Sequence, residues 1–127
     1  ECDPQSGQLR LLQSVSSLPD DFDALQNSTA ECLLTHDGRF LYVANRGHNS
    51  LAGYTVDGES GKLTRISLTP TEAVPRSFAI SSDDRFLYSA GEESGNVACF
   101  RIESDGRLTR FDTVESGPVS WCIACVR

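Results

Sequence analysis

Short runs of β-branched and aromatic residues alternate along the chain with clusters of Gly, Asp, Ser and Asn. No segment keeps the 3.6-residue spacing of apolar positions that marks an amphipathic helix, so we expect almost no helix. Apolar runs of this length between turn residues are typical of β-strands. The pattern predicts two groups of four strands, at residues 31–35, 39–44, 50–56 and 62–68, and at 77–81, 85–90, 96–102 and 107–113.

The two groups of predicted strands repeat one another in sequence. Residues 37–42, Asp-Gly-Arg-Phe-Leu-Tyr, return at 83–88 as Asp-Asp-Arg-Phe-Leu-Tyr, an offset of 46 residues. Residues 61–66, Gly-Lys-Leu-Thr-Arg-Ile, return at 106–111 as Gly-Arg-Leu-Thr-Arg-Phe. Units of four short strands that recur every 45–50 residues or so are typical of the blades of a β-propeller.

The predicted fold is therefore all-β, built from β-propeller blades of four antiparallel strands. Residues 30–68 and 77–113 each form a complete blade, residues 3–16 supply the outer strand of a preceding blade, and residues 119–126 supply the inner strand of a closing blade. Two blades alone leave open sheet edges and an uncovered face. We interpret residues 1–127 as the C-terminal part of one propeller domain, completed by further N-terminal blades or by self-association.

Strand counting divides the loops between two faces, because antiparallel strands reverse direction at every turn. The linkers into the inner strands share a face with the hairpins between the second and third strands. On this face the two blades differ most: Glu31 aligns with Ser77, and Arg46-Gly47-His48 aligns with Glu92-Glu93-Ser94. We expect function where the repeat is broken, since the shared positions are used for packing.

Composition and charge narrow the range of partners. The chain has 11 Lys and Arg against 18 Asp and Glu, a formal net charge of −7. This balance argues against nucleic acid and membrane surfaces as partners, because both attract basic proteins. The five cysteines are odd in number and lack the spacing of a disulfide framework, which favours reduced thiols and a cytoplasmic location.

Several chemical motifs are missing from the sequence. Cys122 and Cys125 form the only close cysteine pair, and no neighbouring His completes a zinc site. His36 and His48 fall on opposite faces of the predicted blade, so we do not expect them to share a metal. The sequence has no Walker loop, dinucleotide fingerprint or Gly-x-Ser-x-Gly motif. We therefore expect neither a metal nor another cofactor.

Three motifs carry a resemblance to a known family: Ala-Glu at 30–31, Asn-Arg-Gly-His at 45–48 and Pro-Arg-Ser-Phe at 75–78. With the turn sequences described above, they make the chain strongly resemble the lactonase family of seven-bladed propellers over about residues 3–126. The resemblance implies that the two blades belong to a seven-bladed ring. One departure is Ser-Asp-Asp at 82–84, which lacks the usual turn glycine.

The resemblance implies a hydrolase that opens a sugar lactone, most specifically 6-phosphogluconolactone to 6-phosphogluconate in the pentose phosphate pathway. The substrate is then a small anionic lactone, and the activity belongs to the parent protein rather than to these 127 residues alone. Two alternatives stay open. One is a cycloisomerase that closes a muconate into a lactone, and the other is a non-catalytic propeller that binds a protein partner.

Four residues on the variable face are the candidates for this chemistry. Glu31 and His48 are candidate catalytic residues, because a carboxylate or a neutral imidazole can take a proton from water. Arg46 and Arg76 are candidate substrate-binding residues, because a guanidinium can hold an oxyanion, a phosphate or a carboxylate. The structural alternatives are a salt bridge between Glu31 and either arginine, and a turn-capping role for His48.

Other noticeable residues receive structural interpretations. The repeated residues Asp37, Asp83, Arg39 and Arg85 are expected to form turns and strand ladders. Trp121 is expected to pack between blades, and the pair Glu92-Glu93 is expected to lie on a solvated face.

Overall fold

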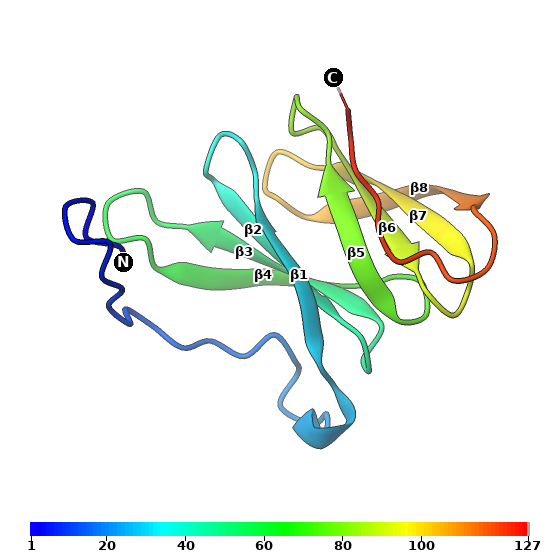
Figure 1. Ribbon diagram of the computed structural model, residues 1–127, viewed down its shortest axis with the longest axis horizontal. Coiled ribbons are helices and arrows are strands. Elements are labelled where there is room, and N and C mark those ends of the chain that lie inside the picture. Colours follow the sequence, from blue (N-terminus) through cyan, green and yellow to red (C-terminus); the bar gives the residue numbers. More distant parts are fainter. Residues whose placement is uncertain (127) are drawn as a thin grey trace.

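Two four-stranded antiparallel sheets lie side by side in the computed structural model, which describes residues 1–126 (Figure 1). The first sheet contains β1 (Thr29–Leu34), β2 (Phe40–Asn45), β3 (Ser50–Val56) and β4 (Leu63–Pro70). The second contains β5 (Pro75–Ile80), β6 (Phe86–Gly91), β7 (Asn96–Ile102) and β8 (Leu108–Glu115). In both sheets the strands follow one another in chain order, as in a propeller blade.

The structure confirms the all-β prediction. The only helix among the described residues is the three-residue 3-10 helix η1, Ala24–Gln26. Strands β3 and β7 have the predicted bounds, and the other six differ from prediction by one or two residues at their ends. No helix within residues 1–126 is long and apolar enough to cross a membrane.

The two flanking segments do not form the strands predicted for them. The only strand-like pairing of residues 3–16 is an isolated bridge from Leu9 to Cys2, just before this segment. Residues 119–126 run beside β5 without a ladder of backbone hydrogen bonds (Figure 1). A strand pairs its backbone groups with those of a neighbouring strand. Here Gln13 reaches Leu63 of β4 through its side chain, and the backbone of Ile123 reaches the side chain of Ser77 on β5, so neither contact forms a ladder.

The core lies between the two sheets rather than within either one. Its buried side chains come from β2 and β3 on one side and from β5 to β8 on the other: Phe40, Tyr42, Ala44, Leu51, Phe78, Ile80, Leu87, Ala98, Phe100 and Leu108. A single sheet would expose this apolar face to water, so each blade depends on its neighbour for stability.

One buried hydrogen bond crosses this core. The hydroxyl of Tyr42 on β2 donates to the carbonyl oxygen of Gly106, in the hairpin between β7 and β8, at 2.7 Å. Gly106 has a φ of 82°, and a Cβ at this position would overlap the ring of Phe40. Glycine is therefore required here both for the turn and for the close approach of the two blades.

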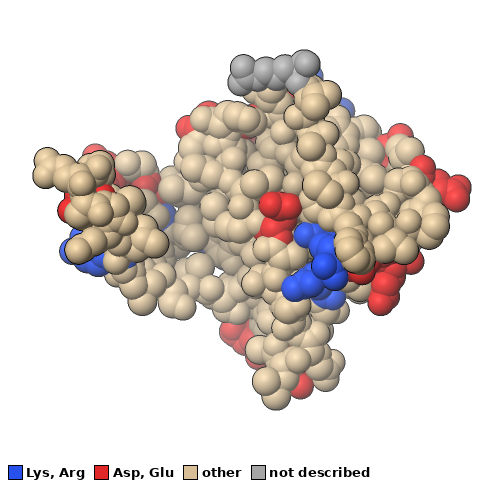
Figure 2. All heavy atoms as spheres, viewed as in Figure 1, with Lys and Arg blue, Asp and Glu red and all other residues tan. Residues whose placement is uncertain are grey.

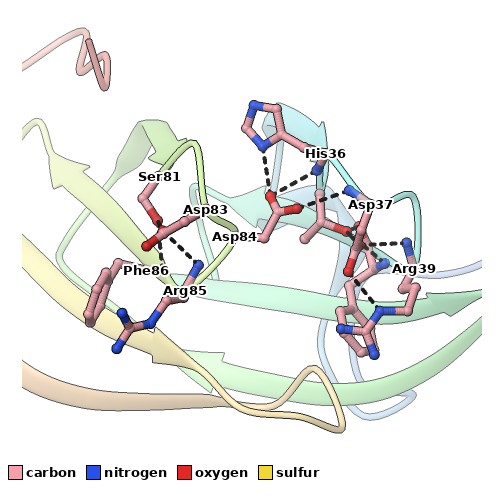
Figure 3. Close-up of polar contacts among 10 residues, drawn as sticks. His36, Asp37, Arg39, Ser81, Asp83, Asp84, Arg85 and Phe86 are labelled. Atoms are coloured by element: carbon pink, nitrogen blue, oxygen red, sulfur yellow. Dashed lines mark hydrogen bonds and ion pairs between the residues drawn. The ribbon is translucent and has the colours of Figure 1, made fainter. Parts of the chain in front are cut away.

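The repeated aspartates close the hairpins between the first and second strands. Asp37 Oδ1 accepts hydrogen bonds from Thr35 Oγ1 at 2.7 Å and from the backbone N–H of Arg39 at 3.0 Å. Hydrogen bonds from the backbone and side chain of Arg39 and from Thr35 lower the pKa of Asp37 to about 2. The matching turn of the second blade uses Asp83, Ser81 and Arg85 (Figure 3). These contacts agree with the structural interpretation of the repeat.

Asp84 stands where the first blade has Gly38, and both residues have a positive φ, of 56° and 75°. Aspartate is one of the few residues other than glycine that tolerate this conformation. Its carboxylate reaches the first blade and accepts hydrogen bonds from the backbone N–H groups of His36, at 2.8 Å, and Asp37, at 2.9 Å (Figure 3). The ring Nδ1 of His36 lies 2.7 Å from the same carboxylate. The usual turn glycine is thus replaced by an aspartate whose carboxylate forms hydrogen bonds between the two blades.

We predict that Asp84→Gly lowers the free energy of unfolding of the complete protein by about 1–2 kcal/mol, because the glycine keeps the turn but loses the inter-blade hydrogen bonds. Burial of Asp84 opposes its ionisation, yet the hydrogen bonds from His36 and Asp37 outweigh burial and lower its pKa. A carboxylate with a lowered folded pKa stabilises the fold above its unfolded pKa and loses this effect as the pH falls.

Urea unfolding checks this prediction in wild type, Asp84→Gly and the exposed control Asp20→Asn. The stability gap between wild type and Asp84→Gly should be present at neutral pH and shrink as the pH falls from 3.8, the ordinary value, through the lowered folded pKa. A gap that does not change with pH would show that the carboxylate charge contributes nothing.

Candidate functional site

Glu31 lies in an irregularity at the start of β1. The pairing of β1 with β2 joins Thr29 to Asn45 and Cys32 to Val43, so two residues of β1 lie opposite one residue of β2. Such a bulge bends the strand and changes the direction of the side chains within it, and bulges often occur beside active sites. The backbone thus presents Glu31 outside the regular alternation of the sheet.

Arg76 lies in the matching irregularity of β5. Pro75 pairs with Gly91 and Ser77 pairs with Ala90, which leaves Arg76 as the additional residue. The two blades therefore break their ladders at the same place, and each places one of the predicted site residues in the break.

A groove of about 390 Å³ runs between β1, β5 and the C-terminal segment. Glu31 and Ser77 lie where these two inner strands begin, and His36 follows the end of β1. The remaining lining is mostly apolar, and the complete set is Glu31, Leu33, Leu34, His36, Ser77, Phe78, Ala79, Ile80, Cys122, Ile123, Ala124 and Cys125. The groove therefore combines mainly apolar residue types with the Glu31 carboxylate at the start of β1.

Glu31 is the one predicted site residue that lines this groove. The hydroxyl of Ser77 donates a hydrogen bond of 3.0 Å to Glu31 Oε2. Within residues 1–126, Glu31 forms no ion pair, so the salt bridge to Arg46 or Arg76 considered from the sequence does not occur there. The carboxylate is partly buried, held by a neutral donor, and left without a cation among the described residues.

Arg46 lies beside the start of β1 at the end of β2. One terminal nitrogen, Nη2, donates a long hydrogen bond of 3.4 Å to the carbonyl oxygen of Thr29. Its Nε is buried without a hydrogen-bond partner among residues 1–126, and the described residues give it no ion-pair partner. Acidic and basic side chains adjoin in the middle of Figure 2, where Figure 1 has β1 and β5. With one long hydrogen bond and no ion pair among the described residues, the guanidinium of Arg46 keeps N–H donors that an anion could accept from.

Arg76 is in a different electrostatic position, because its charge is neutralised. Its Nε lies 2.6 Å from Glu92 Oε2, in the hairpin between β6 and β7. The indole N–H of Trp121 donates to Glu92 Oε1 at 3.0 Å, and the Arg76 guanidinium lies 5.1 Å from the centre of the Trp121 ring. These three residues form a clamp, which we call the Arg76 clamp, that holds the C-terminal segment against the second blade.

Sequence reasoning missed Glu92, which was assigned to a solvated face, and it expected Trp121 to be a packing residue. Trp121 is in fact 58% exposed and makes polar contacts. A signal was present in the repeat alignment, because the second blade replaces Ala30 by Arg76 and Arg46 by Glu92. A positive and a negative charge introduced together on one face of the same blade indicate an ion pair.

His48 is held by contacts of its own. Its Nδ1 lies 2.8 Å from Ser50 Oγ, its backbone N–H donates to Asn27 Oδ1 at 3.1 Å, and the edge of its ring meets Phe22 with centroids 4.8 Å apart. His48 is not among the residues that line the groove with Glu31. A catalytic role for His48 remains a prediction.

The described residues show no cluster of three or more His, Cys, Asp or Glu side chains that could hold a metal ion. The five cysteines all carry free thiols. Burial raises the pKa of the Cys99 thiol, which disfavours its reactive thiolate form.

Comparison with known families decides the assignment. Residues 1–125 match the family model described as "Lactonase, 7-bladed beta-propeller". The chain belongs to the lactonase family of seven-bladed propellers. The predicted propeller fold is thereby confirmed, and the two sheets are consecutive blades. Inner strands surround the axis of a propeller, so the groove between β1 and β5 faces the axis of the ring.

Two relatives show how much of this family the chain represents. It is 41% identical over 126 residues to 6-phosphogluconolactonase of Bacillus subtilis, which covers 97% of the chain and 36% of the relative. It is 37% identical over 103 residues to 6-phosphogluconolactonase of Xenorhabdus nematophila, with 80% and 31% covered. The chain thus spans about a third of the length of these relatives.

Solved structures agree with the fold. A protein from Lactobacillus plantarum superimposes with a TM-score of 0.89 at 32% identity, over 96% of this chain and 36% of that one. The periplasmic gluconolactonase of Pseudomonas aeruginosa superimposes with a TM-score of 0.85 at 32% identity, over 93% of this chain and 33% of that one.

We predict that Glu92→Ala loosens the C-terminal segment, because both Arg76 and Trp121 lose their shared acceptor. Amide hydrogen exchange in the complete lactonase-family protein checks this: exchange in residues 119–126 should rise about tenfold or more, whereas exchange in β6 and β7 changes little. The matched control is Glu93→Ala, which removes the neighbouring, exposed carboxylate. Equal exchange in both variants would rule out the Arg76 clamp as the attachment of the segment.

Proposed function

We propose that this chain supplies part of the active site of a lactone hydrolase, whose substrate is a sugar lactone such as 6-phosphogluconolactone. The observation that carries the proposal is the Glu31 carboxylate, which lines the axial groove, is held by Ser77 and has no ion-pair partner among residues 1–126. The names of the relatives, 6-phosphogluconolactonase and gluconolactonase, support the class of substrate.

Glu31 is suited to act as a general base. Ser77 occupies its Oε2, so Oε1 is the atom available to a water molecule. In the proposed reaction Oε1 takes a proton from water while the water oxygen attacks the carbonyl carbon of the lactone. The ring C–O bond then breaks, and the departing alkoxide takes up the proton held by Glu31. The product is the open hydroxy acid.

Arg46 is suited to bind the anionic part of the substrate. Its charge has no carboxylate partner among the described residues, whereas Arg76 already pairs with Glu92. A guanidinium that is not neutralised gains most from a phosphate or a developing oxyanion. We therefore assign recognition of the anion chiefly to Arg46, and we propose that Arg76 acts with Glu92.

The first test measures by pH-stat the rate at which the complete protein hydrolyses 6-phosphogluconolactone and unphosphorylated gluconolactone. The rate of spontaneous ring opening is subtracted. Glu31→Gln keeps the shape of the side chain and removes its basicity, so we expect kcat to fall about 10²–10⁴-fold. The control Glu59→Gln removes an exposed carboxylate from the hairpin between β3 and β4 and should keep the wild-type rate.

Two outcomes would overturn the proposal. One is a folded wild-type ring that accelerates neither lactone, which would leave the cycloisomerase and the protein-binding propeller to be tested with a muconate and with binding assays. The other is full activity in Glu31→Gln.

The second test concerns selectivity for the anion. Arg46→Ala should lower kcat/KM for the phosphorylated lactone about 10–100-fold and lower it much less for gluconolactone, because the lost interaction is with the phosphate. Arg101→Ala, which removes an exposed arginine from β7, is the control for net charge. An equal loss for both lactones in Arg46→Ala would assign Arg46 to the oxyanion instead.

We also propose a cytoplasmic location and completion of the ring by further blades of the same protein. Free thiols at all five cysteines support a reducing compartment. The exposed apolar side chains of Leu9 and Leu11 in the N-terminal segment, 84% and 83% accessible, support further blades that pack against this segment.

A further inference from the structure

The hydroxyl oxygen of Ser77 on β5 links β5 to β1 and to the C-terminal segment. Its side chain is buried, with 4% of the residue exposed, although serine is usually a surface residue. The hydroxyl donates to Glu31 Oε2 on β1 at 3.0 Å. The backbone N–H of Ile123, in the C-terminal segment, donates to the same hydroxyl oxygen at 3.3 Å.

The two hydrogen bonds fix the direction of the serine proton. A hydroxyl has one proton to donate and two lone pairs that accept. Because Ile123 supplies a donor, it occupies a lone pair, and the single proton of Ser77 is free to point at Glu31. Docking of the C-terminal segment therefore favours the orientation in which Ser77 holds the carboxylate.

Ser77 and Glu31 occupy equivalent positions in the repeat, 46 residues apart. Equivalent positions of neighbouring blades lie side by side around the axis, so each faces the other. Two carboxylates there would repel one another, and two serines would leave no base. The break in the repeat at this position creates one donor and one acceptor that match.

We propose that Ser77 is a positioning residue for Glu31 in the hydrolysis of the lactone, an inference that rests on the proposed function. Glu31 lies in a bulge, where no regular ladder fixes the strand, and a long side chain there has several rotamers. The hydrogen bond to Oε2 selects one of them and leaves Oε1 directed to water. In this role Ser77 acts through Glu31 and takes no proton from the water or the lactone.

The test compares Ser77→Ala with Ser77→Thr and with a matched control. Ser77→Ala should lower kcat about tenfold and change KM less than twofold, because the lost bond orients the base rather than binding the substrate. Ser77→Thr retains a hydroxyl and should recover most of kcat. The control is Ser89→Ala on β6, a fully buried serine whose Oγ has no hydrogen-bond partner among residues 1–126.

The outcomes separate this inference from the proposed function. If Ser77→Ala keeps the wild-type kcat while Glu31→Gln is inactive, the positioning role is wrong and the hydrolase proposal stands. If Ser77→Ala and Ser89→Ala lose equal activity in parallel with a lower Tm, and Ser77→Thr gives no recovery, the role of Ser77 is structural only. Full activity in Glu31→Gln would overturn both proposals.

Discussion

Each of the two sheets must bury one apolar face against the other, and the other features of the structure depend on this constraint. Neither sheet has a core of its own, since the buried side chains of β2 and β3 meet those of β5 to β8. The repeat in the sequence follows from this arrangement, because every blade must present one apolar face to the blade before it and another to the blade after it. The Tyr42 hydroxyl and Gly106 then fix how closely the two blades approach.

Polar contacts at the two ends of this core set the alignment of the blades. At one end the Asp84 carboxylate accepts hydrogen bonds from backbone N–H groups of the first blade, and at the other end the Ser77 hydroxyl donates a hydrogen bond to Glu31. Both contacts involve positions where the blades differ in sequence. The structural tie and the proposed active site thus arise in the same way, as complementary differences between neighbouring repeats.

The fold could be predicted from the sequence because its signals are local and repeated. Turn residues such as Asp37 and Asp83 mark hairpins in each blade, and strands β3 and β7 were predicted with their observed bounds. The flanking strands could not be predicted correctly, since whether residues 3–16 and 119–126 form strands depends on neighbours rather than on their own pattern. The partner of Asp84 was equally out of reach, because an inter-blade contact leaves no periodic signal.

The candidate site was predictable in part. The break in the repeat pointed to Glu31, Arg46 and Arg76, but it could not show that Arg76 is paired with Glu92 while Arg46 is unpaired within the described chain. Pairing depends on side-chain reach across strands, which alignment does not contain. Ser77 was visible only as the counterpart of Glu31, and its role required the distance between the two side chains.

The bulges at the starts of β1 and β5 have a broader consequence. An additional residue at the rim of a sheet is absorbed locally, so the strand below it keeps its register and its apolar face. One blade can carry the carboxylate of Glu31 in its bulge and the next the guanidinium of Arg76, without any change in the apolar face that packs between the blades. The bulge positions can therefore change residue type in one blade at a time, and with it the chemistry at the axis, while the packed strands and their stability are preserved.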